Sequence, residues 1–284
     1  MRPVWLTLGM LVCVSLAHAQ PAVGAGGVVN AASFNANGAA VAPGSIVSIF
    51  GTNLATTIPQ PDTIPLSTGW SDVTSVTFNN IDAGLYYISA GQINAQLPFN
   101  VLPAGQTSGT VPIVVTRSSG ASAPQSVTVA QAAPGIFTAN ATGLGQAIAT
   151  DNDDNAIAAP AGAIAGLTTH PISIGSGHAL IVWCTGLGAV TPPPGSQPIG
   201  NYVPAPTVNG QFWNTVLQPT VLIGGVAATP IYSVLSPQFV SEYQIGVVPA
   251  VGTPTGDAVS LQIQILINGV TVTTSNQVTI AVAP

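Results

Sequence analysis

Strict alternation of apolar and polar residues is the clearest pattern in the chain, and it is strongest near the C-terminus. From Val259 to Ile267, Val, Leu and Ile occupy every second position, with Ser and Gln at most of the positions between them. This period of two predicts a β-strand with one buried face. The dipeptide Asn268-Gly269 then favours a tight turn into the segment VTVTT. We therefore expect a long antiparallel hairpin at this end of the chain.

Similar segments occur twice along the chain. GSIVSIFGTNL (44–54) aligns without gaps with GHALIVWCTGL (177–187), and a Pro-rich loop that ends in Trp follows each. Further on, VTFNNIDAGLYYIS corresponds to VLIGGVAATPIYSV, and QINAQLPFNV corresponds to QIGVVPAV. Short strands about every ten residues, with no helical period, are typical of β-sandwiches of roughly 100 residues. The sequence predicts an all-β fold of two tandem immunoglobulin-like β-sandwiches.

The N-terminus has the pattern of an export signal. A single positive charge precedes an apolar run from Val4 to Ala17, and Ala17-His18-Ala19 matches the small-residue cleavage pattern. We predict a signal peptide over 1–19, followed by a first Ig-like repeat with an N-terminal hairpin (20–135). A connecting β-hairpin region (136–172) and a second Ig-like repeat (173–284) complete the chain. The mature protein is expected to be secreted or held at the cell surface, without inserting into a membrane.

The chain has very little charge: 4% of its residues are charged, with 2 Lys+Arg against 8 Asp+Glu. Phosphate backbones are bound through Lys and Arg, so nucleic-acid binding is excluded as a function. After signal removal Arg117 is the single basic residue. Sheet edges are ordinarily protected by Lys and other charges, or by Pro and bulges. We therefore expect a protein partner, or self-association, through the sheet edges.

The segment DNDDN (151–155) is the densest group of charges. Asp151, Asp153 and Asn155 stand at positions one, three and five, as the oxygen ligands of a calcium loop do. However, Ala156 takes the place of the Gly at position six, and position twelve is Gly162, not Glu. Two interpretations stay open: a polar turn, or a weak calcium site formed by those three residues. No other cofactor is expected.

Aromatic residues form a second candidate site. Trp70 and Trp213 end equivalent loops, and Tyr202 and Phe212 lie near the second of them. Exposed rings of this kind stack on sugar faces or on proline-rich peptides. The alternative is that each Trp closes one end of its own sandwich, since large aromatic residues near a strand start are usually buried.

Catalytic patterns are weak. His170 and His178 are the histidines that follow the signal peptide, and the chain has no G-x-S-x-G elbow. The sequence supports no pair of neighbouring carboxylates for glycoside hydrolysis. We predict that the protein is not an enzyme.

Eight segments together resemble a known family. VVNAASF, VAPGSIVSIFGTNLA, YYISAGQINAQLPFNV, AAPGIFT, GQAIA, TGLGAVTPP, VLIGGVAA and YQIGVVPA are similar to an uncharacterised C-terminal domain family of secreted acidobacterial proteins. The segment PGSIVSIFGTNL resembles the IPT/TIG branch of Ig-like folds. The resemblance covers essentially the whole mature chain. It implies export, tandem Ig-like structure, and adhesion, structural or recognition roles at the cell surface, and it supplies no catalytic residues. The alternative function is a carbohydrate-binding module or an inactive accessory of an exported hydrolase.

Overall fold

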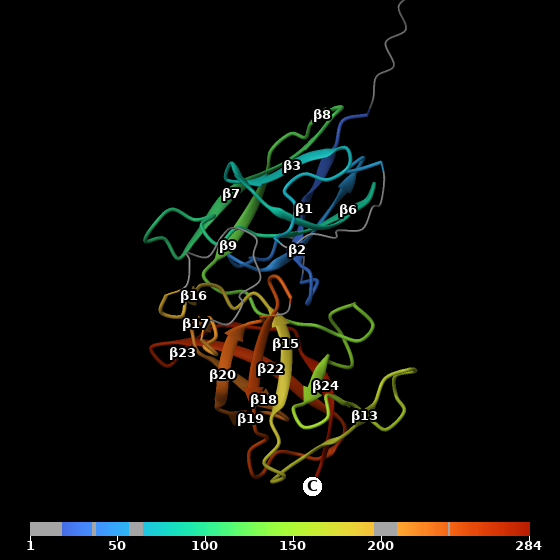
Figure 1. Cartoon of the computed structure of the whole chain (residues 1–284), viewed down its shortest axis with the longest axis vertical. Coiled ribbons are helices and arrows are strands. Elements are labelled where there is room, and N and C mark those ends of the chain that lie inside the picture. The colour runs from blue at the N-terminus through green and yellow to red at the C-terminus, as the bar shows by residue number, and fades with distance from the viewer. Residues whose placement is uncertain (1–18, 36–37, 57–64, 196–208, 238) are drawn as a thin grey trace, which may run out of the picture.

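The computed structural model describes residues 19–35, 38–56, 65–195, 209–237 and 239–284. Within these ranges all the regular structure is β-strand, as predicted. The strands form two bodies that follow one another along the long axis of the molecule (Figure 1). The predicted signal peptide, apart from Ala19, lies outside the described residues. In the described part of the chain, no helix has the length and apolar character needed to cross a membrane.

The first body is a sandwich with the strand order of an Ig-like domain. One sheet has the order β1 (Ala22–Asn30), β2 (Ile46–Thr52), β6 (Gln92–Gln96), β5 (Gly84–Ile88). The facing sheet has the order β4 (Ile81–Asp82), β3 (Val73–Phe78), β7 (Ser108–Arg117), β8 (Gly120–Ala121), with β9 (Gln125–Ala130) also paired to β7. When the strands are lettered in chain order, the first sheet contains strands A, B, E and D of an Ig-like domain. The facing sheet contains strands C, F and G.

The second body repeats this order. Its first sheet contains the path β11 (Ala149–Asp151), β15 (Leu180–Thr185), β21 (Tyr243–Val247), β20 (Pro230–Leu235). The facing sheet has the order β14 (Ile172–Ser173), β24 (Val278–Ala283), β22 (Gly256–Ile267), β18 (Pro219–Ile223), β19 (Val226–Ala228), with β23 (Val270–Thr274) also paired to β22. Strands β2 and β15, which lie within the two aligned segments, occupy the same position B. The predicted repeat therefore corresponds to two Ig-like β-sandwiches.

Short strands extend the first sheet of the second sandwich at both edges. One edge carries β12 (Ile157–Ala158) and β13 (Thr169–His170), and the other carries β17 (Asn214–Thr215) and β16 (Val190–Thr191). In addition, β10 (Gly135–Ile136) pairs with β15. The segment 136–172, predicted as a connecting hairpin, thus contributes its strands to the second sandwich. The local sequence predicts the turn of this segment. The sheet edge that its strands join is set by pairing with residues far away in the sequence.

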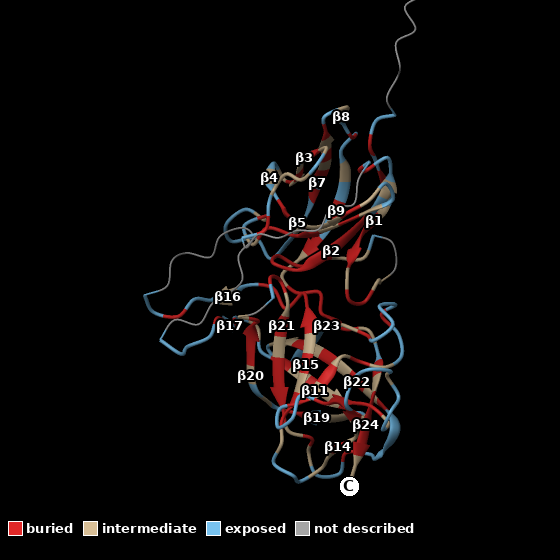
Figure 2. Ribbon diagram, turned by 45° about the vertical axis from the view of Figure 1, so that its right-hand side comes forward, coloured by how far each residue is buried: buried red, intermediate tan, exposed pale blue. Residues whose placement is uncertain are grey.

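Each sandwich has its own apolar core between its two sheets. In the first core, Ile49 of β2 lies opposite Ile93 of β6, and in the second, Val182 of β15 lies opposite Ile245 of β21. Figure 2 shows these buried residues as red bands on the strands of both bodies. The alternation along β22 buries its apolar face as predicted, with Val259, Leu261, Ile263 and Ile265 in the second core.

The predicted hairpin turn after β22 is confirmed. Asn268 and Gly269 both have positive φ angles, of 51° and 78°, as a two-residue type I′ turn requires. The turn leads directly into β23.

Direct hydrogen bonds join the two sandwiches. The backbone N–H of Ile46 on β2 donates to Oγ1 of Thr185 on β15 over 3.1 Å. The Asn30 side chain donates to the carbonyl of Ala133 over 2.9 Å, and the Tyr86 hydroxyl donates to the carbonyl of Val240. The start of β2 therefore meets the end of β15 at the junction between the two sandwiches.

Candidate functional site

The DNDDN segment forms the turn between β11 and β12, and its carboxylates hold the backbone of the turn. Asp151 is 3% exposed, and its Oδ1 accepts the N–H of Asp153 over 2.9 Å. Asp154 Oδ1 accepts the N–H of Ala156, also over 2.9 Å. Asn155 has a φ of 62°, a left-handed conformation that Asn tolerates better than most residues. The polar-turn interpretation is therefore sufficient to explain why Asp and Asn stand at these positions.

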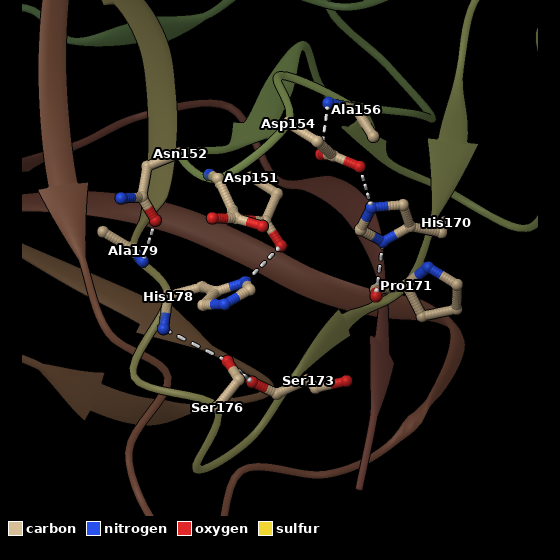
Figure 3. Close-up of polar contacts among 11 residues, drawn as sticks. Asp151, Asn152, Asp154, Ala156, His170, Pro171, Ser173, Ser176, His178 and Ala179 are labelled. Carbon is tan, nitrogen blue, oxygen red and sulfur yellow. Dashed lines mark hydrogen bonds and ion pairs between the residues drawn. The ribbon is translucent and has the colours of Figure 1, made fainter.

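Both histidines of the described chain approach this turn (Figure 3). His170 Nε2 lies 3.0 Å from Asp154 Oδ2, and His178 Nδ1 lies 3.2 Å from Asp151 Oδ2. Two strand pairings bring them there. The parallel pair β12–β13 sets His170 opposite Ala158, four residues beyond Asp154, and the antiparallel pair β11–β15 sets Asp151 opposite Leu180. Side chains far apart in the sequence thus form one cluster of Asp151, Asp154, His170 and His178, the His/Asp cluster.

Within the His/Asp cluster, the contacts of Asp154 and His170 favour the charged form of each side chain. The N–H of Ala156, followed by the His170 ring, lowers the pKa of the Asp154 carboxyl. The carbonyl of Pro171, followed by the Asp154 carboxylate, raises the pKa of His170. Both shifts favour an ion pair between the Asp154 carboxylate and the protonated His170 ring.

The residues whose ligand atoms converge differ from those predicted as calcium ligands. Asp151, Asp154 and His170 each offer one ligand atom, and these three atoms lie within 4.8 Å of one another. The predicted residue Asp153 is exposed and lies outside this group, and Asn155 is also exposed. Sequence spacing recognised Asp151 but missed Asp154 and His170. No local pattern could have indicated His170, because the β12–β13 pairing brings it to the turn.

The aromatic residues predicted to form one site do not lie together in the structure. Trp213 is only 4% exposed and belongs to the second core, so the stacking role proposed for its ring is wrong and the core-closing alternative holds. Trp70 is half-buried and packs against the first core. Phe212 is exposed and lines a groove of about 390 Å³ with Pro192, Pro193, Pro194 and Tyr232. Tyr202 lies outside the described residues.

A larger cleft, of about 630 Å³, lies at the junction of the two sandwiches. Its lining combines four aromatic rings with polar side chains: Phe34, Tyr86, Tyr87, Phe137, Ser48, Gln92, Asn94 and Glu242. Burial raises the pKa of the Glu242 carboxyl from 4.5 to about 7. This junction cleft was not predicted from the sequence, because its residues come from both repeats and only the docking of the sandwiches brings them together.

Comparisons with known proteins add little to this picture. No protein-family model matches the chain, and no curated protein matches it. Among solved structures, a tandem pair of titin Ig domains is similar, with 11% sequence identity over 85% of this chain and 90% of that chain, at a TM-score of 0.19. The assignment of the fold rests instead on the strand order, in which A, B, E and D face C, F and G in both repeats. The chain is an all-β protein of two tandem Ig-like sandwiches.

Proposed function

We propose that this chain is an exported, non-catalytic tandem Ig-like protein that acts in adhesion, surface structure or recognition outside the cell. It works by adding a strand of a partner, or of a second copy, to an open sheet edge. The pattern of residues 1–19 and the resemblance to the secreted acidobacterial family support export. The observation that carries the binding role is the exposed edge strand β23.

One side of β23 is open in the described part of the chain. The strand is hydrogen-bonded to β22, with a β-bulge between Ile265 and Leu266, and no described strand pairs with its other side. Val270 is 65% exposed and Val272 is 50% exposed. The sequence VTVTT contains no charge and no Pro, so of the usual means of blocking an edge this strand has only the bulge. Its free backbone groups are therefore available to an added strand.

A groove runs beside this edge. Val272, Thr273 and Thr274 line it together with residues 130–134, which link the two sandwiches, and its volume is about 370 Å³. An extended segment that paired with β23 would be held by main-chain hydrogen bonds, and its side chains would reach this groove. This arrangement corresponds to strand addition, in which the backbone supplies affinity and side-chain pockets supply specificity.

Sedimentation of the purified protein over a range of concentration and salt tests the proposal. We expect wild-type protein to associate and Val272→Lys to reduce the association at least tenfold, because the new charge must be desolvated at the edge. Val251→Lys adds the same charge at an exposed turn and serves as the control. A pull-down from the cell envelope with the same variants tests a heterologous partner. If the wild-type protein stays monomeric and Val272→Lys captures the same proteins as wild type, the proposal is wrong.

The junction cleft supports a second candidate, a carbohydrate-binding module. Aromatic rings beside amide side chains suit the apolar faces and hydroxyl groups of sugars. Glycan-array binding that is lost in Phe137→Ala and retained in Phe212→Ala would favour the junction cleft. The opposite result would favour the groove beside Phe212, one of the aromatic residues that the sequence analysis named as candidates. Absence of glycan binding by wild-type protein would exclude this candidate.

A further inference from the structure

The His/Asp cluster lacks any fixed positive charge. The turn holds Asp151, Asp153 and Asp154, three of the eight acidic residues of the chain. The chain has no Lys, and one of its two Arg residues, Arg2, stands in the predicted signal peptide. The other, Arg117, is bound in the first sandwich to the Asp72 carboxylate and to the carbonyl of Asn53. The described part of the chain therefore places no Lys or Arg side chain beside the buried Asp151 carboxylate.

The hydrogen bonds of His170 point to a cation at one definite place. Its Nδ1 lies 3.0 Å from the carbonyl oxygen of Pro171, which can only accept, so Nδ1 carries a proton. In a neutral ring, Nε2 then holds a lone pair and faces the Asp154 carboxylate at 3.0 Å. Two acceptors at this distance repel each other, so the contact holds either a second ring proton on Nε2 or a metal ion bound to both atoms. A backbone carbonyl that fixes the tautomer in this way is the usual partner of a metal-bound histidine.

The spacing of the ligand atoms suits a small, four-coordinate ion. Nitrogen and oxygen ligands lie about 2.0–2.1 Å from zinc, so neighbouring ligands of a tetrahedral site are about 3.3 Å apart. The contact between His170 and Asp154 is 3.0 Å, and the three converging atoms lie within 4.8 Å of one another. Changes of up to about 1.5 Å in these separations, made by the two more exposed side chains, would place all three atoms around one ion.

The donor set selects the class of ion. Calcium and magnesium prefer oxygen ligands, whereas imidazole suits zinc and its first-row neighbours. We propose that Asp151, Asp154 and His170 bind a divalent cation of the zinc class. His178, 3.2 Å from Asp151 Oδ2, is a positioning residue that orients that carboxylate. The fourth coordination position is left to water or to a side chain of a partner. This inference is independent of the strand-addition proposal.

The test uses the untagged protein and three probes, Zn²⁺, Co²⁺ and Ca²⁺. We expect one equivalent of Zn²⁺ to bind by calorimetry and to raise the melting temperature, because the ion binds the folded state. Co²⁺ is expected to give the intense visible absorption of a tetrahedral site. Ca²⁺ at the same concentration should leave the melting temperature unchanged. His170→Gln and Asp154→Asn should each weaken Zn²⁺ binding at least tenfold.

Asp153→Asn is the matched control, because it removes the same charge from the same turn at an exposed position outside the converging set. It should change Zn²⁺ affinity by less than about threefold, which corresponds to roughly 0.6 kcal/mol. Circular dichroism of each variant establishes that it folds, and Asp154→Asn alters an exposed side chain, so it keeps the test valid if His170→Gln does not fold. The proposal is overturned if Zn²⁺ does not bind, if Ca²⁺ binds as well as Zn²⁺, or if Asp153→Asn loses as much affinity as Asp154→Asn. In the first case, the second proton of His170 alone supplies the cation.

Discussion

The pH dependence of stability that Glu242 causes provides a quantitative test of how the two sandwiches bury this residue at their junction. Its carboxyl lines the junction cleft, and in the described part of the chain it has no hydrogen-bond or ion-pair partner. Burial raises its pKa from 4.5 to about 7. Each pKa unit corresponds to about 1.4 kcal/mol, so the rise makes roughly 3 kcal/mol of the folding free energy depend on whether Glu242 is protonated.

The direction of the pH dependence follows from linkage. Because the pKa of Glu242 is higher in the folded state than in the unfolded state, the folded state binds its proton more tightly. The contribution to stability is therefore full below pH about 4.5 and is lost as the pH rises through about 7. Glu242→Gln keeps the shape of the side chain and removes the titration. The variant should lack this loss, and it should be more stable than wild type at pH 8 by roughly 3 kcal/mol.

Urea unfolding followed by tryptophan fluorescence at pH 5, 6, 7 and 8 measures the difference between the two proteins. Taking this difference removes contributions shared by both, including the contribution from His170, whose pKa is also raised. Asp257→Asn removes one negative charge from an exposed position on β22 and controls for net charge. If Glu242→Gln and wild type lose stability in parallel between pH 5 and pH 8, then the Glu242 carboxyl is solvated and its burial at the junction cleft is incorrect.

Four further substitutions test buried contacts of the two sandwiches. Arg117→Met should destabilise the first sandwich by about 3–5 kcal/mol, because it leaves the half-buried Asp72 carboxylate without its ion-pair partner, and adding Asp72→Asn should recover part of the loss in urea unfolding. Trp213→Ala should cost about 3–5 kcal/mol by removing a ring from the second core, measured by thermal unfolding. Gly186→Ala should lower the melting temperature measured by calorimetry, because φ is +84° and the new Cβ would lie 2.1 Å from the carbonyl oxygen of Ala133.

Local sequence patterns determined the strands and turns of this protein. The alternation from Val259 to Ile267 predicted a strand with one buried face, and its apolar residues form part of the second core. Asn268-Gly269 predicted a two-residue hairpin turn, and both residues have the required positive φ angles. The gapless match of 44–54 with 177–187 predicted a repeated unit, and both segments form strand B of a sandwich. These features depend on neighbouring residues, whose period and turn chemistry act over only a few positions.

Only the tertiary structure decided which side chains meet. His170 reaches Asp154 because β12 and β13 pair in parallel, and the DNDDN spacing contains no information about that pairing. Trp213 turns into the core and Phe212, its neighbour in sequence, turns outward, and the sequence pattern could not choose between a stacking role and a core-closing role for Trp213. The junction cleft forms from both repeats when the sandwiches dock. Pairing between distant strands and docking between domains are set by the burial of whole surfaces, and no short stretch of sequence specifies them.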